Sequence, residues 1–169
     1  NQSGKIFCRL KPALMFQNPD HQLLLPTCSS DLLLSISSDL TDRERERQVQ
    51  TVLNQVGLAG FEDRPIHTLS GGQKQRLALA GALASEANLL LLDEPTALLD
   101  PLSQVKVLEI VQSLCKRQNK PITAIWITHR LQELDYADGA ARMESGQVGA
   151  WHSGLLLKKL LHPLAGRML

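Results

Sequence analysis

The sequence predicts an α/β fold built on parallel strands. Three short apolar runs, at residues 13–16, 89–92 and 122–127, are typical of strands buried in a parallel sheet. Helical signals lie between them: an apolar face at helical spacing in residues 49–56, and an Asp-Pro helix start at Asp100. The 169 residues suffice for one domain with a real core, or for most of a larger one.

Composition and charge narrow the classes of protein that fit. Hydrophobic residues make up 43% of the chain, so it should fold, and a net charge of +1 gives no reason to expect a nucleic-acid partner. The three cysteines lack metal-ligand spacing and fit a reducing compartment. The leucine runs are too short to span a membrane. We see no secretory signal, because the sequence does not open with a basic segment followed by an apolar one. We expect a protein that is soluble or held on a membrane by a partner.

The glycine-rich segment at residues 69–73, Leu-Ser-Gly-Gly-Gln, predicts a loop that turns into a helix. Ser70 is a good N-cap, and Gly71 and Gly72 let a bulky anion approach the backbone closely. The helix start behind them offers free N–H groups and a positive dipole end, which suit a phosphate.

The apolar run at 89–92 is followed at once by two carboxylates, Asp93 and Glu94. They sit at the carboxyl end of the predicted strand, where α/β folds place their chemistry. An anion cradle together with two acids at a strand tip indicates a metal–phosphate site.

These two segments resemble a known family. Residues 69–73 resemble the signature motif of ABC-type ATPases, and residues 89–94 resemble their Walker B strand. Either segment alone also fits a glycine-rich helix start or an ordinary core strand, whereas the pair at this spacing is far more specific. The resemblance implies a P-loop NTPase-like core with parallel strands and an inserted helical subdomain, and it implies ATP and Mg²⁺ as ligands.

Residues 16–22, Phe-Gln-Asn-Pro-Asp-His-Gln, resemble the Q-loop of the same family, especially that of energy-coupling-factor and cobalt-type importers. In the family, the glutamine that matches Gln17 reaches the Mg²⁺ and water side of the nucleotide. The alternative is an ordinary turn that ends a strand, since Asn-Pro is common at turns.

Residues 30–67 match the helical subdomain of that family. We expect a first helix at 30–36 and a second that begins at a capping box, Thr41 to Glu44. The alternating charges at 43–47 indicate a solvated helix face. The apolar face of the second helix is predicted to comprise Val49, Val52, Leu53 and Val56, with Gly57 as the C′ residue and a loop at 60–67 containing Pro65.

The signature helix is expected at residues 72–84, and a later helix begins at Asp100 with Pro101 in its first turn. Residues 96–100 resemble the D-loop of the family, with Ala97 in place of the usual small polar residue. The core face of the later helix is predicted to comprise Val105, Leu108, Val111, Leu114 and Cys115.

After the strand predicted at 122–127, His129 resembles the switch histidine of the family, which senses the γ-phosphate. A lone histidine at a strand end is more often structural, but its place one strand after Walker B favours the functional interpretation. A short helix at 131–136, a hairpin around Ser145 and Gly146, and a tail helix broken by Pro163 are expected to follow.

The start of the chain matches the family least. Residues 1–5, Asn-Gln-Ser-Gly-Lys, superficially resemble the end of a P-loop, but Ile6 stands where Ser or Thr would bind Mg²⁺. We expect a turn at Ser3 and Gly4 and a short strand at 5–10 instead. Only 16 residues precede Gln17, whereas one βαβ unit takes ~30. The sequence therefore predicts a single, N-terminally incomplete ABC ATPase domain, either a fragment or a natural truncation.

We divide this partial domain, residues 1–169, into four expected regions. They are 1–29 with the first strand and Q-loop, 30–67 as the helical subdomain, 68–152 with the signature, Walker B, D-loop and switch, and 153–169 as a C-terminal tail.

The resemblance implies ATP hydrolysis, in which catalysis is mostly positioning and charge neutralisation. Glu94 would polarise the attacking water, Asp93 would hold Mg²⁺ through water, and Gln17 would sense the metal and the water. His129 would contact the γ-phosphate. Without a Walker A lysine, the isolated chain should bind ATP poorly.

The family also implies partners. Ser70, Gly71 and Gly72 would bind the γ-phosphate of a nucleotide held by a second ABC ATPase subunit, in a head-to-tail homo- or heterodimer. Gln73 and Asp100 would be further nucleotide-binding residues. A transmembrane transporter subunit would be the other partner, which places the protein on the cytoplasmic face of a bacterial plasma membrane or the stromal side of a plastid membrane.

Three functions remain open at this stage. The first is a transporter ATPase subunit that drives uptake of a solute such as a metal ion or a vitamin. The second is a non-transport ABC ATPase, against which the lack of sustained heptads argues. The third is a non-catalytic partner that donates only its signature motif, against which Glu94 and His129 argue.

Overall fold

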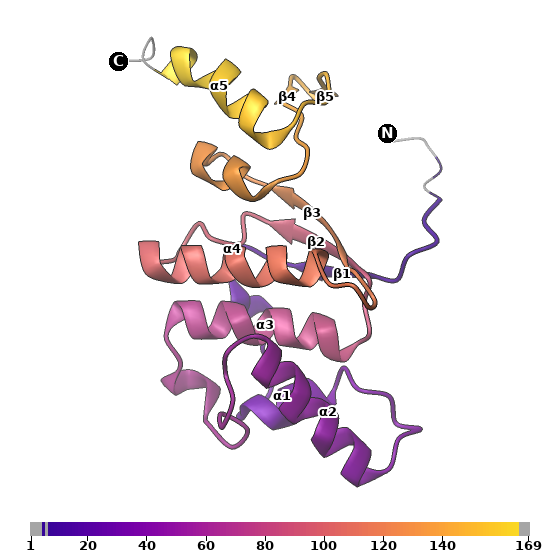
Figure 1. Ribbon diagram of the computed structural model, residues 1–169. Helices are drawn as coiled ribbons and strands as arrows, with labels where there is room; N and C mark the ends of the chain where they lie inside the picture. Colours follow the sequence, from indigo (N-terminus) through magenta and orange to yellow (C-terminus); the bar gives the residue numbers. More distant parts are fainter. Residues whose placement is uncertain (1–4, 6, 166–169) are drawn as a thin grey trace. The chain divides into compact units, whose positions relative to one another are not determined.

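The computed structural model describes Lys5 and residues 7–165, with side chains to residue 161. The chain forms two compact units, Asn1–Ile127 and Thr128–Leu169 (Figure 1). The turn expected at Ser3 and Gly4, like most of the P-loop-like stretch, lies outside the described residues. The strand expected at 5–10 was wrong. Residues 7–10 are irregular and Phe7 is 91% exposed, because no strand in the described part of the chain pairs with this segment.

A parallel sheet forms the centre of the first unit and confirms the α/β prediction. Its strands are β1 (Pro12–Met15), β2 (Leu89–Asp93) and β3 (Thr123–Ile127), in the order β1-β2-β3 (Figure 1). Met15 lies opposite Leu92, which in turn lies opposite Trp126. The carboxyl ends of the three strands therefore meet at one edge of the sheet.

Only the central strand is buried in the way the sequence predicts. In β2, Leu89 is buried on one face of the sheet, and Leu90 and Leu92 are buried on the other. The prediction of full burial was wrong for the outer strands: Leu14, Ile125 and Ile127 are exposed. Successive side chains of a strand point to opposite faces, and in β1 and β3 only one of these faces joins the helical core.

Two helices follow the first strand. The segment after β1 contains the 3₁₀ turn η1 (Pro19–His21) and leads to α1 (Cys28–Leu33). This helix starts before the predicted residue 30 because Thr27 and Ser30 form a capping box. Helix α2 (Asp42–Gln55) begins at the predicted capping box of Thr41 and Glu44. It ends before Gly57, whose φ of 68° confirms the expected left-handed C′ residue.

The 3₁₀ turn η2 (Ile66–Thr68) precedes α3 (Gly71–Ala84), which matches the predicted signature helix. Helix α4 (Pro101–Cys115) lies beside α3 (Figure 1). Its core face was predicted correctly at Leu108, Val111 and Leu114, but Val105 is exposed and Val107 is buried in its place.

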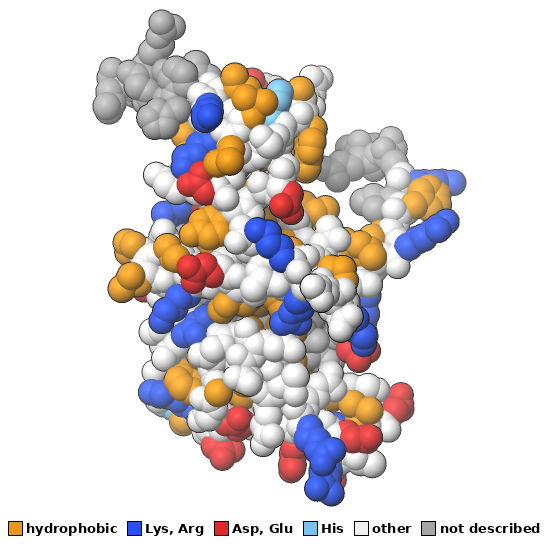
Figure 2. All heavy atoms as spheres, in the orientation of Figure 1, with side chains coloured by type: hydrophobic (Ala, Val, Ile, Leu, Met, Phe, Trp, Pro, Cys, Tyr) orange, Lys and Arg blue, Asp and Glu red, His pale blue; other side chains and the backbone are white. Residues whose placement is uncertain are grey.

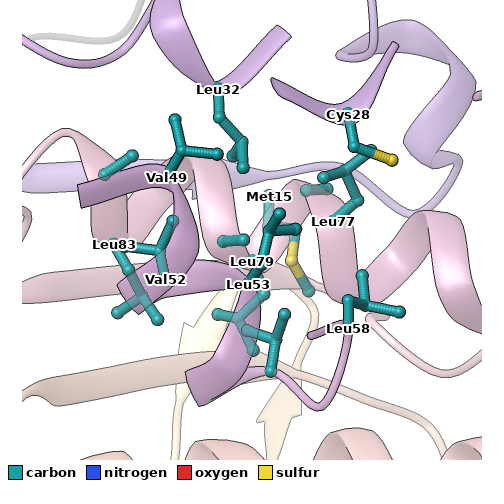
Figure 3. Close-up of a cluster of buried hydrophobic side chains, with 14 of the residues drawn as sticks. Met15, Cys28, Leu32, Val49, Val52, Leu53, Leu58, Leu77, Leu79 and Leu83 are labelled. Carbon is teal, nitrogen blue, oxygen red and sulfur yellow. The ribbon is translucent and has the colours of Figure 1, made fainter. Parts of the chain in front are cut away.

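One continuous core joins these helices to the sheet. Figure 3 shows Leu53 of α2 and Leu77 of α3 close to Met15 of β1, and all three are almost completely buried. The charged run at the start of α2 stays outside this core. Figure 2 shows acidic and basic side chains interspersed over that helix, and Arg43, Glu44, Glu46 and Arg47 are all exposed, as expected for a solvated face.

The second unit comprises the 3₁₀ helix η3 (Leu131–Tyr136), the antiparallel strands β4 (Met143–Glu144) and β5 (Gln147–Val148), and α5 (Gly154–Ala165). The hairpin turns at Ser145 and Gly146, as predicted, where φ is 49° and 76°. The break expected at Pro163 was wrong, because α5 continues through this residue to Ala165. No helix in the described part of the chain is long and apolar enough to cross a membrane.

Candidate functional site

The tip of β2 holds the two acids. Asp93 is exposed at the end of the strand, and Glu94 follows it in a left-handed backbone conformation with φ of 43°. The Glu94 N–H donates to the Ile127 carbonyl at 3.0 Å, which ties this turn to β3. A non-glycine residue in this region of φ/ψ space costs ~1–3 kcal/mol, and such strain tends to gather at functional sites. The backbone at Glu94 is therefore a reason to expect function there.

Strand register brings Gln17 to Glu94. Met15, the last residue of β1, lies opposite Leu92 of β2, and Gln17 and Glu94 each follow two residues after this pair. Gln17 Nε2 donates a hydrogen bond to Glu94 Oε2 at 3.1 Å. A donor held against one carboxylate oxygen fixes the direction of the other oxygen, so the pair can orient a water molecule placed beside it.

The start of α3 presents backbone N–H groups. Ser70 Oγ accepts from the Gln73 N–H at 3.3 Å, while Gln73 Oε1 accepts from the Ser70 N–H at 2.8 Å. This capping box uses the N–H groups of Ser70 and Gln73, so those of Gly71 and Gly72 are the ones that the helix start can offer to an anion.

The two glycines of this helix start differ in their surroundings. A Cβ on Gly72 would clash with the side chain of Ser103, so the close approach of α3 to α4 favours glycine there. A Cβ on Gly71 would meet only Leu99 Cδ2, at an ordinary 3.8 Å. Packing therefore explains Gly72, whereas the exposed Gly71 has room for a side chain.

Asp100 acts as the N-cap of α4. Its Oδ1 accepts from the backbone N–H groups of Leu102 at 3.1 Å and Ser103 at 3.0 Å. Hydrogen bonds from the Ser103 side chain and backbone lower the pKa of this carboxyl group below its usual value. Asp100 thus has a structural role as a helix cap, whereas the family resemblance implied a role in nucleotide binding.

His129 is exposed at the start of the second unit. Among the described residues, no three His, Cys, Asp or Glu side chains gather as a preformed metal site. Mg²⁺ is usually held by one or two carboxylates together with substrate phosphates. Asp93 and the amide oxygen of Gln17 are hard oxygen donors at the same edge of the sheet, so they fit an ion that arrives with a nucleotide.

Sequence reasoning missed two contacts of the signature helix. Lys74 Nζ forms an ion pair with Asp20 Oδ1 of η1 at 2.7 Å. Arg76 Nη1 donates to the carbonyls of Val56 at 3.0 Å and Gly57 at 2.8 Å, at the C-terminal end of α2. Burial lowers the pKa of this guanidinium. The partners are far apart in sequence, so no local pattern could have indicated either contact.

A parallel sheet with an acidic strand tip, a glutamine facing that tip and a glycine-rich helix start define the class of α/β nucleotide-binding proteins. Comparison with protein families matches residues 2–97 to the family described as ABC transporter. Since the match covers more than half of the 169 residues, the chain belongs to the ABC transporter family.

Named relatives agree with this assignment. The chain is 45% identical over 148 residues to ABC transporter I family member 10 of Arabidopsis thaliana, covering 86% of this chain and 55% of that protein. It is 39% identical over 140 residues to the energy-coupling factor transporter ATP-binding protein EcfA1 of Leuconostoc mesenteroides, covering 82% of this chain and 52% of that protein. The chain thus spans about half the length of the curated relatives it matches.

Solved structures share the fold. The structure of cbiO1 from Clostridium perfringens, part of the ABC transporter complex cbiONQ, matches with a TM-score of 0.81 and 29% identity over 94% of this chain and 64% of that chain. A dimeric, post-hydrolysis state of the ATP-binding cassette MJ0796, bound to ADP and Pi, matches with a TM-score of 0.70 and 26% identity over 86% of this chain and 63% of that chain.

Proposed function

We propose that this chain supplies the Q-loop, signature and Walker B part of an ATP-hydrolysing subunit of an ABC importer. The observation that carries the proposal is the 3.1 Å hydrogen bond from Gln17 to Glu94, beside Asp93 at the tip of β2. It joins an orienting amide, a general base and a metal-binding carboxylate at the edge of the sheet where α/β folds act.

The residues divide the work of hydrolysis between them. Glu94 accepts the proton of the attacking water, while the Gln17 amide holds the Glu94 carboxylate in place. Asp93 would hold Mg²⁺ through water, and the ion would supply charge neutralisation for the phosphates. We assign His129 the role of a γ-phosphate contact. Gly71 and Gly72 bind the γ-phosphate of a nucleotide held by a second ABC ATPase subunit.

The proposal includes a membrane partner. Leu24 is 72% exposed, and its backbone N–H donates to Asp31 Oδ1 at 2.7 Å, which holds the segment so that the side chain faces outward. Leu25 N–H donates to the same oxygen at 3.0 Å. An apolar side chain fixed outward beside the Q-loop suits a transmembrane transporter subunit, and the matched cbiO1 is described as part of a transporter complex. The protein would then act at the cytoplasmic face of a membrane and drive solute uptake.

Glu94→Gln tests the proposed chemistry. In the complete subunit, which includes the nucleotide-binding loop, this variant should bind ATP normally and lose hydrolysis by about 10²–10⁴-fold, because the amide cannot accept the proton. Binding is measured by calorimetry with Mg-ATP and hydrolysis by phosphate release. Hydrolysis at the wild-type rate would remove Glu94 from the role of base. Glu109→Gln, on the exposed surface of α4, is the matched control and should change neither quantity.

A further inference from the structure

We propose that Gln22 is a positioning residue, whose side chain holds the start of the Q-loop so that Gln17 faces Glu94. The Phe16 N–H donates to Gln22 Oε1 at 2.9 Å. Gln22 Nε2 donates to the Leu14 carbonyl at 2.8 Å. Leu14 lies in β1, and Phe16 follows the end of β1 and directly precedes Gln17.

The geometry explains why an amide side chain is needed here. β1 is an outer strand of the sheet, so one of its edges has no strand beside it in the described part of the chain. Such an edge leaves N–H and C=O groups that need partners. A glutamine side chain carries both an N–H donor and a carbonyl acceptor, like a peptide group. Gln22 therefore makes the two hydrogen bonds that one residue of a neighbouring strand would make.

The same contacts close the Q-loop into a small ring. At its far end, the Gln22 N–H donates to the Pro19 carbonyl at 2.9 Å, and within it the Asp20 N–H donates to Asn18 Oδ1 at 3.0 Å. Along the chain, Gln17 thus lies between two fixed segments: Phe16, which is bonded to Gln22, and the capped turn η1.

The signature helix adds two contacts to this ring from outside. Lys74 Nζ pairs with Asp20 at 2.7 Å, and Gln75 Nε2 approaches the Phe16 carbonyl at 3.5 Å. The backbone on both sides of Gln17 is therefore fixed, and freeing the Phe16 end would let Gln17 move away from Glu94.

The direct test uses NMR on the 169-residue chain with Gln22→Met, which keeps the length of the side chain and removes both hydrogen bonds. Amide exchange of Phe16 should become about fivefold faster, as expected for the loss of one hydrogen bond. The side-chain NH₂ resonances of Gln17 should move toward those in Glu94→Ala, where the partner is absent. Gln50→Met, on the exposed surface of α2, is the matched control and should change neither signal.

Two results overturn the positioning role. The first is unchanged Phe16 exchange in Gln22→Met, and the second is faster Phe16 exchange with unmoved Gln17 resonances, which would limit Gln22 to protecting the strand edge. If Gln22→Met fails to fold, Gln22→Glu provides the test: its carboxylate can accept from Phe16 but cannot donate to Leu14. Its Phe16 amide should exchange at a rate between wild type and an unprotected amide, and its Gln17 resonances should move part of the way. Unmoved Gln17 resonances in Gln22→Glu would again contradict the role.

The catalytic consequence rests on the proposed function and can be separated from it. In the complete subunit, Gln22→Met should lower kcat with little change in KM for ATP, and it should have no further effect when Gln17 is already alanine. An equal loss in both backgrounds would show a merely structural role for Gln22. If Gln17→Ala alone leaves hydrolysis unchanged, the proposed role of Gln17 fails, while the positioning of its side chain is still decided by the NMR result.

Discussion

At the scale of single residues, the backbone conformation of Glu94 predicts that glycine is more stable than alanine at this position. Its φ of 43° suits glycine better than any residue with a Cβ. Glu94→Gly should therefore be about 1 kcal/mol more stable than Glu94→Ala, although both remove the carboxylate and should lose hydrolysis. Denaturant unfolding measures the difference. Glu109 is exposed and lies in the middle of α4, so the order should reverse there. Glu109→Gly should be about 1 kcal/mol less stable than Glu109→Ala. Equal stabilities at position 94 would mean that the turn relaxes readily.

The two glycines of the signature helix should also respond differently to alanine. Gly72→Ala places a methyl group against Ser103 and should destabilise the fold by about 1–3 kcal/mol. Gly71→Ala makes only an ordinary contact with Leu99, so its stability should stay within about 0.5 kcal/mol of wild type while the proposed phosphate docking is lost.

A double-mutant cycle checks the packing explanation for Gly72. Ser103→Gly removes the atoms that the new methyl group would meet, so the combined variant should be more stable than the sum of the two single effects predicts. Strict additivity would place the cause of the Gly72 requirement elsewhere.

At the scale of elements, the cap of α4 predicts a response to acid. The folded pKa of Asp100 lies below its unfolded value, so the stabilisation is complete above the unfolded pKa, near pH 4, and is lost as pH falls through the folded pKa. Asp100→Ser keeps a capping oxygen that does not titrate in this range. Its free energy of unfolding should fall less steeply than that of wild type below about pH 4. Parallel curves for the two proteins would show that this carboxylate does not contribute to the acid response.

Local signals predicted the elements well where the cause of an element is local. The capping box at Thr41, the Asp-Pro start at Asp100 and the turn at Gly146 each depend on residues within one turn of the chain, and each appears as expected. Exposure of the outer strands depends instead on which elements lie beside them. The sequence of an apolar run such as 122–127 does not show whether other elements pack on one face of the strand or on both.

The candidate site shows the same division. The acids and glycines were predicted from the sequence because each occurs beside a strand end or a helix start. Gln22 and Lys74 were not, because their partners are set by strand register and by the approach of α3 to η1. Arg76, which joins α3 to the C-terminal end of α2, likewise looks in the sequence like one more basic residue on a helix.

At the scale of the whole molecule, the segment after the Q-loop allows the proposed contact with a membrane partner to be tested. Residues 23–25 are three consecutive leucines, and such a run fits either the interior of the fold or a contact with a partner. Leu23 packs against the core, whereas Leu24 is 72% exposed on a backbone that Asp31 holds in place. A side chain that contributes little to the core can be changed at small cost in stability.

Leu24→Glu in the complete subunit should therefore release it from membranes that contain the transporter subunit, because a charge would have to be buried in an apolar contact. Its ATPase activity in solution should stay close to wild type. Leu102→Glu, at a similarly exposed leucine near the start of α4, is the matched control and should leave membrane association unchanged. Co-purification with the membrane subunit is compared with the activity of the free protein. Membrane association that persists in Leu24→Glu, or a joint loss of fold and activity, would assign Leu24 to the stability of the subunit instead of to its docking surface.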